Sequence, residues 1–359
     1  MACEQTEWLG TPEYLEHFNR KVAEQRIPIS GSMSLTHRCN LRCLHCYLGP
    51  LAPADRVGNG EMTTDQVLSV IDQVTESGCL FFLITGGEPL LRQDFAAIYR
   101  RARTNGLLVT VFSNGTLMSE PILDLFEELP PRAVEITLYG ATPSTYERIT
   151  GVEGSYRRCI TGVEQLLDRG IRVQLKTMLM TLNRHEFFDV VDMAEAYGCR
   201  FRSDAALFPR LDGDKAPVEL RVPPAEAVEL ELRDEDRVRA WREFYEGMKD
   251  LPASDALYQC GAGLTTFHVD PYGYLQPCLM TNRYKCDIVN GSFEAGWREF
   301  IPRIRERKAP PDFPCSSCEF RMLCGFCPPF FELENGAEDR PSDYLCTMGR
   351  LRWNTVTSR

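Results

Sequence analysis

Cysteine is the residue type whose number and spacing in this chain could do chemistry. The chain has 359 residues and 15 of them are cysteine, which is many for a cytosolic enzyme and few for a small disulfide scaffold. One group lies near the start of the chain and a second group lies in its last hundred residues. No secretory signal is visible, and a reducing cytoplasm keeps thiols available as ligands. We therefore expect a cytoplasmic protein with two metal-binding modules.

The front group is Cys39, Cys43 and Cys46, a Cys-x3-Cys-x2-Cys pattern directly after an expected strand. Three thiolates on one short loop could grip a 4Fe–4S cluster, which normally takes four cysteines, and leave one iron open. A tetrahedral zinc site normally has four closed ligands, and His45 would have to fold back to complete it. At this point a zinc loop and an iron–sulfur site both remain open.

Three motifs of the front half together resemble the radical S-adenosylmethionine (SAM) superfamily. The superfamily signature is Cys-x3-Cys-x-aromatic-Cys, and here His45 stands in the aromatic position with Tyr47 after the last cysteine. The second motif is the turn Gly86-Gly87-Glu88-Pro89, which follows an expected strand, and the third is Ser113-Asn114-Gly115 after the next strand. The resemblance implies that SAM contacts all of these residues.

The resemblance also implies a reaction and a fold. In the superfamily the turn binds the methionyl amino group, from which Glu88 would accept a charge-assisted hydrogen bond. Ser113 and Asn114 would contact the ribose. Further candidate SAM contacts near later strand ends are Thr137, Arg148 and Lys176. The cluster of such enzymes cleaves SAM into methionine and a 5′-deoxyadenosyl radical, which abstracts a hydrogen atom. The implied fold is a partial (β/α)₆ barrel.

The back cysteines resemble the SPASM extension of radical SAM enzymes, with one internal spacing of two residues in place of three. The resemblance assigns a far auxiliary 4Fe–4S cluster to Cys315, Cys318, Cys324 and Cys346. It assigns a near auxiliary cluster to Cys260, Cys278 and Cys327, so the chain would carry three clusters. Cys286 is a candidate fourth ligand of the near cluster; otherwise that cluster has an open iron. From the spacing alone, paired zinc sites are also allowed. The single residues Cys3, Cys79, Cys159 and Cys199 we expect to pack as small hydrophobes or to lie in disordered chain.

The elements that must position these residues alternate between strands and helices over about 31–205. Short apolar runs predict strands at 32–35, 80–85, 107–112, 133–138, 171–178 and 200–202. Amphipathic stretches predict helices at 64–77, 95–104, 120–128, 156–168 and 186–197, with Thr64 as an N-cap and glycines just past the helix ends. The pattern predicts an α/β fold with parallel strands, a partial (β/α)₆ TIM-like barrel of six strands rather than eight.

We expect four segments along the chain. They are an N-terminal extension at 1–30, the radical SAM barrel at 31–205, a bridging segment at 206–254 and a SPASM domain with its tail at 255–359. The bridge is rich in proline and acidic residues, which favours a solvated linker and helix face. The SPASM domain should contain a β-hairpin, since Phe267-His268-Val269 and Tyr274-Leu275 flank the turn residues Asp270 to Gly273.

The substrate that the resemblance implies is a ribosomal peptide or protein, modified oxidatively at a side chain or the backbone. Leu279 stands where formylglycine-forming relatives carry an aspartate base, and only 38 residues precede Cys39. A separate leader-peptide-binding protein is therefore an expected partner, beside an electron donor such as flavodoxin or ferredoxin. A basic stretch, which an acidic leader could bind but which a solvated helix face explains better, contains Arg298, Arg303, Arg305, Arg307 and Lys308.

Other functions stay open on the sequence. Within enzymes, the chain could act in the tetrapyrrole (heme) pathway or as a small-molecule radical SAM oxidoreductase. From a different class, it could be a non-catalytic zinc-binding interaction module. The net charge of −11 disfavours nucleic acid and membrane surfaces as partners. The longest fully apolar run, 79–84, is far shorter than the ~20 residues that a membrane helix needs.

Overall fold

The chain forms an open α/β sheet with helices on its outer side. The computed structural model describes residues 11–49, 60–249 and 254–358. Within them the strand order is β6-β5-β4-β3-β2-β1-β7-β8-β9. The first seven strands along the chain pair in parallel, and β8 and β9 pair antiparallel at the edge. The strands are β1 (Ser30–Ser34), β2 (Phe81–Thr85), β3 (Leu108–Ser113), β4 (Ala133–Thr137), β5 (Val173–Met178), β6 (Arg200–Asp204), β7 (Thr266–Val269), β8 (Tyr274–Gln276) and β9 (Cys286–Asp287).

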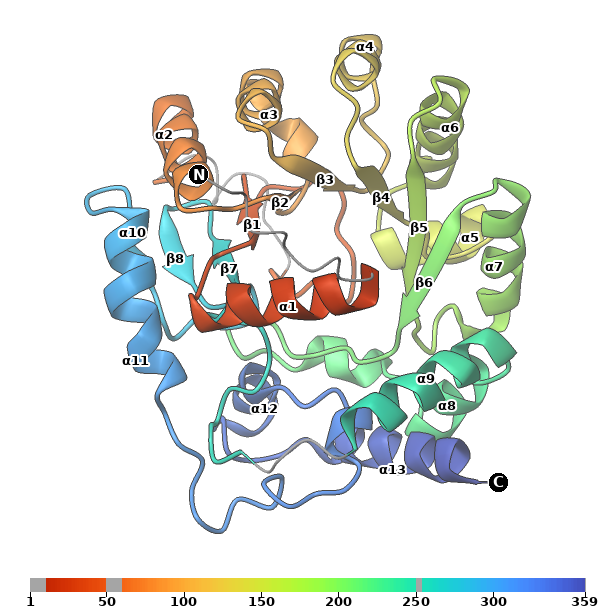
Figure 1. The fold of residues 1–359 in the computed structure, drawn as a ribbon. Coiled ribbons are helices and arrows are strands. Elements are labelled where there is room, and N and C mark those ends of the chain that lie inside the picture. Colours follow the sequence, from red (N-terminus) through yellow and green to blue (C-terminus); the bar gives the residue numbers. More distant parts are fainter. Residues whose placement is uncertain (1–10, 50–59, 250–253, 359) are drawn as a thin grey trace.

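Helices connect the parallel strands and form an outer layer around them (Figure 1). In the barrel they are α2 (Thr64–Glu76), α3 (Phe95–Thr104), α4 (Glu120–Glu128), α5 (Pro143–Thr150), α6 (Ser155–Asp168) and α7 (Phe187–Ala196), with short 3₁₀ turns η1 (Pro89–Leu91) and η2 (Arg184–Glu186). The first helix, α1 (Thr11–Glu24), precedes β1 and crosses the open middle of the arc in the view of Figure 1. Later elements are η3 (Ala216–Leu220), α8 (Pro224–Glu231), α9 (Glu235–Met248), α10 (Phe293–Ala295), η4 (Gly296–Phe300), α11 (Ile301–Arg305), η5 (Arg321–Leu323), α12 (Pro328–Asn335) and α13 (Asp343–Thr357).

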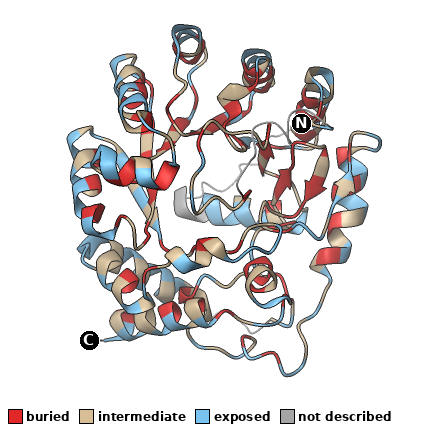
Figure 2. Cartoon of the chain, turned by 180° about the vertical axis from the view of Figure 1, so that it is seen from behind, coloured by how far each residue is buried: buried red, intermediate tan, exposed pale blue. Residues whose placement is uncertain are grey.

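The core lies between the sheet and the outer helices, and Figure 2 shows buried residues along the strands and inner helix faces. One strand face carries the residues that pack against these helices, for example Met33, Ile84, Val111 and Ile136, each fully buried. Because side chains alternate along a strand, the other face of each strand points to the concave side. The six strands β1 to β6 confirm the predicted partial barrel. None of the helices in the described segments is both long and apolar enough to span a membrane.

Local signals predicted the helix ends well, with one error. The glycines at 78, 106, 170 and 198 follow helix ends with φ of 97°, 88°, 67° and 64°, as expected for left-handed residues after a C-cap. The predicted N-cap Thr64 is wrong by one residue. Thr63 is the cap and forms a capping box with Gln66, while Thr64 is helical and donates to Asp94. The sequence reading also missed α5.

The predicted hairpin exists as β7 and β8, but it extends the barrel sheet. β7 pairs in parallel with β1, in the register Ser32 to His268. The close approach depends on Gly31, because a Cβ there would lie 2.2 Å from the ring of Phe267. The strand that opens the barrel is therefore shared with the cysteine-rich part of the chain.

The segment that we expected as a solvated linker is largely helical and partly packed. α8 buries Ala227 and Val228 in a small second core with Val222 and with Met348 of α13. Arg352 of α13 also forms an ion pair with Glu231, at 2.8 Å. This segment thus attaches α13 to the lower edge of the barrel (Figure 1).

Candidate functional site

The loop with the front cysteines follows β1 directly and is held by backbone hydrogen bonds. Arg42 N donates to Thr150 O at 2.8 Å, and Leu44 N donates to Ile149 O at 3.0 Å. Both acceptors are the last carbonyls of α5, which a helix leaves unpaired. The helix that the sequence reading missed is therefore the element that supports this loop.

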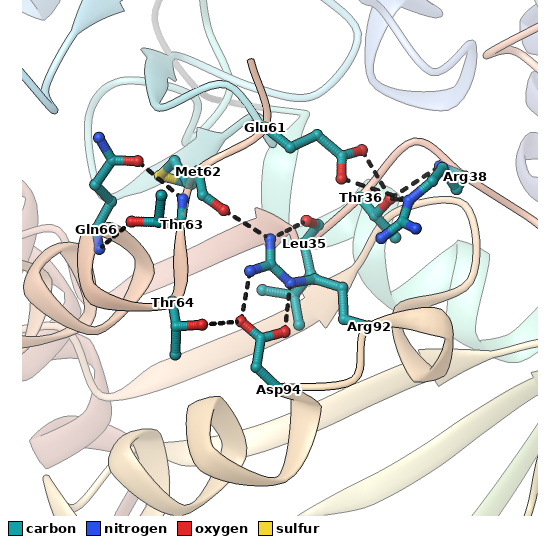
Figure 3. A network of polar contacts seen from close by, with 10 residues as sticks. All are labelled: Leu35, Thr36, Arg38, Glu61, Met62, Thr63, Thr64, Gln66, Arg92 and Asp94. Carbon is teal, nitrogen blue, oxygen red and sulfur yellow. Dashed lines mark hydrogen bonds and ion pairs between the residues drawn. The ribbon is translucent and has the colours of Figure 1, made fainter. Parts of the chain in front are cut away.

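A polar network fixes the chain between β1 and the cysteines (Figure 3). The buried Arg92 donates to the carbonyls of Leu35 and Met62, each at 3.1 Å, and pairs with Asp94 at 2.6 Å. Glu61 accepts from Thr36 Oγ1 at 2.7 Å and from the His37 amide at 3.1 Å. Charge-assisted bonds to buried backbone carbonyls are among the stronger hydrogen bonds in proteins. The network orients the cysteine loop from the N-terminal side.

The Gly-Gly turn packs against the backbone that leads into the cysteine loop. Gly87 N donates to Thr36 O at 2.8 Å, and Glu88 N donates to Arg38 O at 2.9 Å. A Cβ on Gly86 would lie 2.3 Å from Thr36 O, and a Cβ on Gly87 would lie 2.2 Å from Arg38 O. Glycine is required here because another segment of backbone crosses at contact distance. The two sequence motifs therefore form one structural unit.

Glu88 links this turn to the Ser113-Asn114 motif. The side chain is fully buried, and its oxygens accept from Asn114 N at 2.7 Å, Ser113 Oγ at 3.0 Å and Leu90 N at 3.1 Å. Burial raises the pKa of Glu88 to about 7, against the opposing effect of these donors. In the structure, the carboxylate that we expected to receive an ammonium group holds two strand ends together.

The three front thiols lie close enough to affect one another's pKa. Burial raises the pKa of Cys39 to about 11, although the Leu41 N–H donates to its sulfur. Burial, and then the neighbouring Cys46 and Cys39, raise the pKa of Cys43 further. A thiol must lose its proton to bind iron, so ligation here displaces tightly held protons. Asn114 Nδ2 approaches Cys39 Sγ at 3.9 Å, which brings the third motif to the same place.

Aromatic side chains surround these thiols. Tyr139 hydrogen-bonds to Cys43 through its hydroxyl, and its ring meets His45 edge-on at 4.8 Å. Burial lowers the pKa of His45 to about 4, so its imidazole is neutral. Burial, and then Cys46 and Cys39, raise the pKa of Tyr47. The surroundings of the loop thus disfavour free charge and suit a compact metal–sulfur cluster.

Of the three remaining candidate SAM contacts, two lie side by side and the third lies apart from them. Thr137 and Lys176 are register partners on β4 and β5, on the concave face. Burial lowers the pKa of Lys176 to about 7, and its Nζ lies 3.0 Å from the ring centroid of Phe112 and 3.7 Å from Glu135. Arg148 lies on α5 and is exposed to solvent. The structure does not bring Arg148 into the concave face with the other two.

A second site forms around Cys260, Cys278 and Cys327, which line one cavity of about 410 Å³. Strand residues Ser30, Ser32 and Leu83 of the barrel line the same cavity, so it joins the two modules. Burial raises the pKa of Cys278 to about 11 and that of Cys327 to about 12. Arg305 holds one side of the cavity, because its guanidinium donates to Cys260 O at 2.8 Å.

Cys286 is not part of this cavity. It lies on β9 and lines a separate, smaller pocket of about 180 Å³. Its sulfur would be 3.4 Å from a Cβ built on Gly296, so it packs against the π-helical turn η4. The structure therefore does not place Cys286 with the three thiols that we expected it to complete.

A third group consists of Cys315, Cys318, Cys324 and Cys346. Burial, and then the thiols Cys346 and Cys318, raise the pKa of Cys315 to about 12. Burial, and then the other three thiols of this group, raise the pKa of Cys324 to about 12. α13 approaches closely here, because a Cβ on Gly349 would lie 2.4 Å from Cys324 Cβ. The four sulfurs that the sequence reading grouped are thus neighbours.

The residue groups fit iron–sulfur clusters in donor type and number, and all of their cysteines except Cys260 are at least partly buried. Within the described residues, no three His, Cys, Asp or Glu side chains converge tightly enough to hold a single metal ion. The thiols do gather in sets of three, three and four, and burial raises the pKa of most of them. A cubane holds its thiolates farther apart than a single tetrahedral ion does, and the cavity at Cys260 provides such space.

The basic stretch near residue 300 is mostly engaged within the chain. Arg305 holds the Cys260 loop, Arg307 pairs with the buried Glu338 and Lys308 pairs with Asp255 at 2.6 Å. Arg303 lines the small pocket beside Cys286. These contacts agree with the helix-face interpretation of the stretch rather than with a free anion-binding surface.

Sequence reasoning missed several residues of the site. Tyr139 is the second residue after β4, so its place at the carboxyl end of a parallel strand was an available signal. Asn40 accepts from Asn114 Nδ2 at 2.8 Å, and nothing in its spacing indicated this. His268 lies on β7 between Ser32 Oγ, at 2.8 Å, and Ser34 Oγ, at 3.3 Å. Burial lowers the pKa of His268 to about 3, and only the pairing of β7 with β1 reveals this position.

Comparisons with known proteins agree with this geometry. Residues 33–195 match the model of the Radical SAM superfamily. The AdoMet-dependent heme synthase of Methanosarcina barkeri is 29% identical over 340 residues, covering 85% of this chain and 93% of that protein. The mycofactocin maturase MftC of Mycobacterium ulcerans is 26% identical over 329 residues, covering 88% of this chain and 86% of that protein. The crystal structure of Streptococcus suis SuiB bound to precursor peptide SuiA superimposes with a TM-score of 0.71 and 17% identity, over 96% of this chain and 84% of that one.

Proposed function

Residues 33–195 are a radical SAM domain, and from this premise we propose that the chain oxidatively modifies a ribosomal peptide. The domain implies SAM and one 4Fe–4S cluster, which together supply a 5′-deoxyadenosyl radical when bound. The products we expect are a crosslink, a thioether or a related change at a side chain or the backbone.

We assign the first cluster to Cys39, Cys43 and Cys46, with SAM bound between that loop and the Gly86–Pro89 turn. In this arrangement Glu88 does not receive the ammonium group directly, because its oxygens already accept from Ser113, Asn114 and Leu90. Its role is to hold the second and third motifs at a constant separation. Tyr139 and His45 exclude water from the thiols, which protects a reactive radical from side reactions.

We further propose two auxiliary clusters, one on Cys315, Cys318, Cys324 and Cys346 and one on Cys260, Cys278 and Cys327. The observation that carries the proposal is the cavity of about 410 Å³ whose lining combines these last three thiols with strand residues of the barrel. A substrate radical formed on the concave side would therefore be adjacent to a group that can accept its electron. Removal of a hydrogen atom and then an electron and a proton is a two-electron oxidation.

A peptide substrate is supported by the likeness to MftC and to SuiB, which extends over most of each chain. Two further partners belong to the proposal. An electron donor such as flavodoxin or ferredoxin must reduce the first cluster, and a separate leader-binding protein would bring the substrate. The thiols of three clusters persist in a reducing compartment, so we propose that the chain works in the cytoplasm. We keep the division into 1–30, 31–205, 206–254 and 255–359 as a proposal.

The test is mass spectrometry on peptides encoded beside this reading frame. The anaerobically reconstituted chain, with SAM and dithionite, should release 5′-deoxyadenosine and yield a peptide lighter by two hydrogens. The Cys39→Ala variant should do neither. Unchanged peptide mass with deuterium uptake from solvent would indicate epimerisation, and absence of any peptide change with all neighbouring peptides would contradict the proposal.

The second candidate is a reaction on a tetrapyrrole. The observation that favours it is the 29% identity to the heme synthase of Methanosarcina barkeri over nearly the whole of that protein. The same reconstituted chain would be incubated with an iron porphyrin precursor, and the product would be followed by absorption and mass. Conversion of the porphyrin without peptide modification would replace our main proposal.

A further inference from the structure

One more sulfur lies in the cavity of the three thiols. Met280 lines it together with Cys260, Cys278 and Cys327. Its Sδ is 4.0 Å from Cys327 Sγ. A thioether is a soft, weak metal ligand, and among the residues that line the cavity it is the soft donor that remains after the three cysteines.

The other groups that could complete the near cluster are engaged or distant. Cys286 lines a different pocket. Tyr258 lines the cavity, but its hydroxyl donates to the buried Glu338 at 2.5 Å. Ser254, six residues before Cys260, does not line the cavity, and its Oγ accepts from Ala256 N at 3.2 Å. Among the described residues that line the cavity, no further thiol, imidazole or carboxylate remains for the fourth position.

From this geometry we infer that Met280 is the fourth, displaceable ligand of the near auxiliary cluster. The inference deepens the proposed function and rests on its near cluster. The backbone at Met280 is already committed to the site, because its N–H donates to the sulfur of Cys278. The side chain has three rotatable bonds, so Sδ can change its position within the cavity while the backbone stays in place.

Because a thioether binds iron weakly, Met280 could be replaced by a substrate group. A cysteine in its place would close the iron permanently, and an empty position would leave the iron open to water and small anions. Met280 shields the iron and yields to a stronger donor, such as a thiolate or a deprotonated amide of the substrate. Displacement would place the substrate in direct contact with the acceptor of its electron.

The experiment uses the full chain with Cys43→Ala and Cys46→Ala, so that only the auxiliary clusters assemble. The variants are Met280→Leu, which removes the donor, and Met280→Cys, which strengthens it. Met193→Leu on α7 makes the same change at a partly buried methionine outside the cavity and is the matched control. Potassium cyanide is the probe, titrated into the reduced protein and followed by electron paramagnetic resonance, with iron and sulfide counted for each sample.

We expect cyanide to bind the near cluster of Met280→Leu at least about tenfold more tightly than that of the parent, since no ligand must be displaced. Met193→Leu should bind cyanide as the parent does. Met280→Cys should resist cyanide and shift the midpoint potential of the near cluster to a more negative value, because it adds a negative ligand.

Two results would overturn the inference, and they are distinguishable. The parent here is the chain with Cys43→Ala and Cys46→Ala. If it holds about eight iron, the near cluster is present. Met280 is then not a ligand if the parent binds cyanide as tightly as Met280→Leu does, or if Met280→Cys leaves the midpoint potential unchanged. If the parent holds only about four iron and Cys278→Ser does not lower that number, the near cluster itself is absent, and both the proposed near cluster and this inference lose their basis.

Discussion

Gly87→Ala is the substitution that most directly tests how the SAM site is built. The added methyl group would lie 2.2 Å from Arg38 O, 2.7 Å from Arg38 C and 2.9 Å from His37 O. Ordinary contacts begin near 3.4 Å, so the two backbones must separate by about 1 Å. Gly87 does not have a positive φ, so the effect is purely steric.

The size of the effect follows from two contributions. Overpacking of a tight contact costs about 1–3 kcal/mol. Separation of the backbones also weakens the 2.8 Å bond from Gly87 N to Thr36 O, which contributes about 1 kcal/mol. We expect the free energy of unfolding to fall by about 2–4 kcal/mol in total. Because a displacement near 1 Å can cost about 100-fold in rate, release of 5′-deoxyadenosine should fall by at least that factor.

The assays are denaturant unfolding, iron content and 5′-deoxyadenosine release on the anaerobically reconstituted chain. The matched control is Gly247→Ala on α9, where a Cβ meets nothing within 4 Å. This change should stabilise the helix by about 0.5–1 kcal/mol and leave turnover unaltered. If Gly87→Ala kept the iron content, stability and turnover of the parent, the turn and the cysteine loop would not be the coupled unit described above.

Three further expectations concern other parts of the chain. Burial lowers the pKa of His268 from 6.5 to about 3, so on acidification this residue takes up a proton in the unfolded chain before it does so in the folded one. The free energy of unfolding should therefore fall by about 1 kcal/mol between pH 6.5 and pH 5.5 because of this residue. In urea unfolding at several pH values, His268→Gln should show a smaller dependence of this free energy on pH. In Gly349→Ala the added Cβ would lie 2.4 Å from Cys324 Cβ and would displace this proposed ligand. The variant should therefore hold about four fewer iron than the parent by iron analysis, and an unchanged iron content would argue against the far cluster. Cys286→Ser should keep the full iron content, whereas Cys278→Ser should lose up to about four; the reverse order would overturn the assignment of the cavity.

Much of the barrel was predictable because its signals are local. The strand at 108–113 and the helix at 95–104 carry apolar residues at the spacing that burial on one face requires. The glycine after each helix marks where the chain must turn left-handed, and Gly106 shows this with φ of 88°. The sequence pattern did not predict α5, because this helix has only eight residues and begins with Pro143. A helix of that length shows too few turns for a clear period.

The site was predictable as a set of cysteines but not as a set of contacts. The spacing of Cys315 and its three neighbours anticipated a group that the structure brings together. The spacing could not show that Glu88 accepts three internal donors, nor that Cys286 turns toward Gly296. These contacts depend on which strands pair, and the parallel pairing of β7 with β1 joins residues more than two hundred positions apart.

The position of β1 between β2 and β7 has a consequence for truncation. β1 is hydrogen-bonded along both edges, so removal of the chain from residue 255 onward would strip one edge of its partner. A freshly exposed, flat strand edge seeks another strand and promotes aggregation. The front half expressed by itself should therefore precipitate or pair with itself, and a shortened version for engineering would need a capping strand in place of β7.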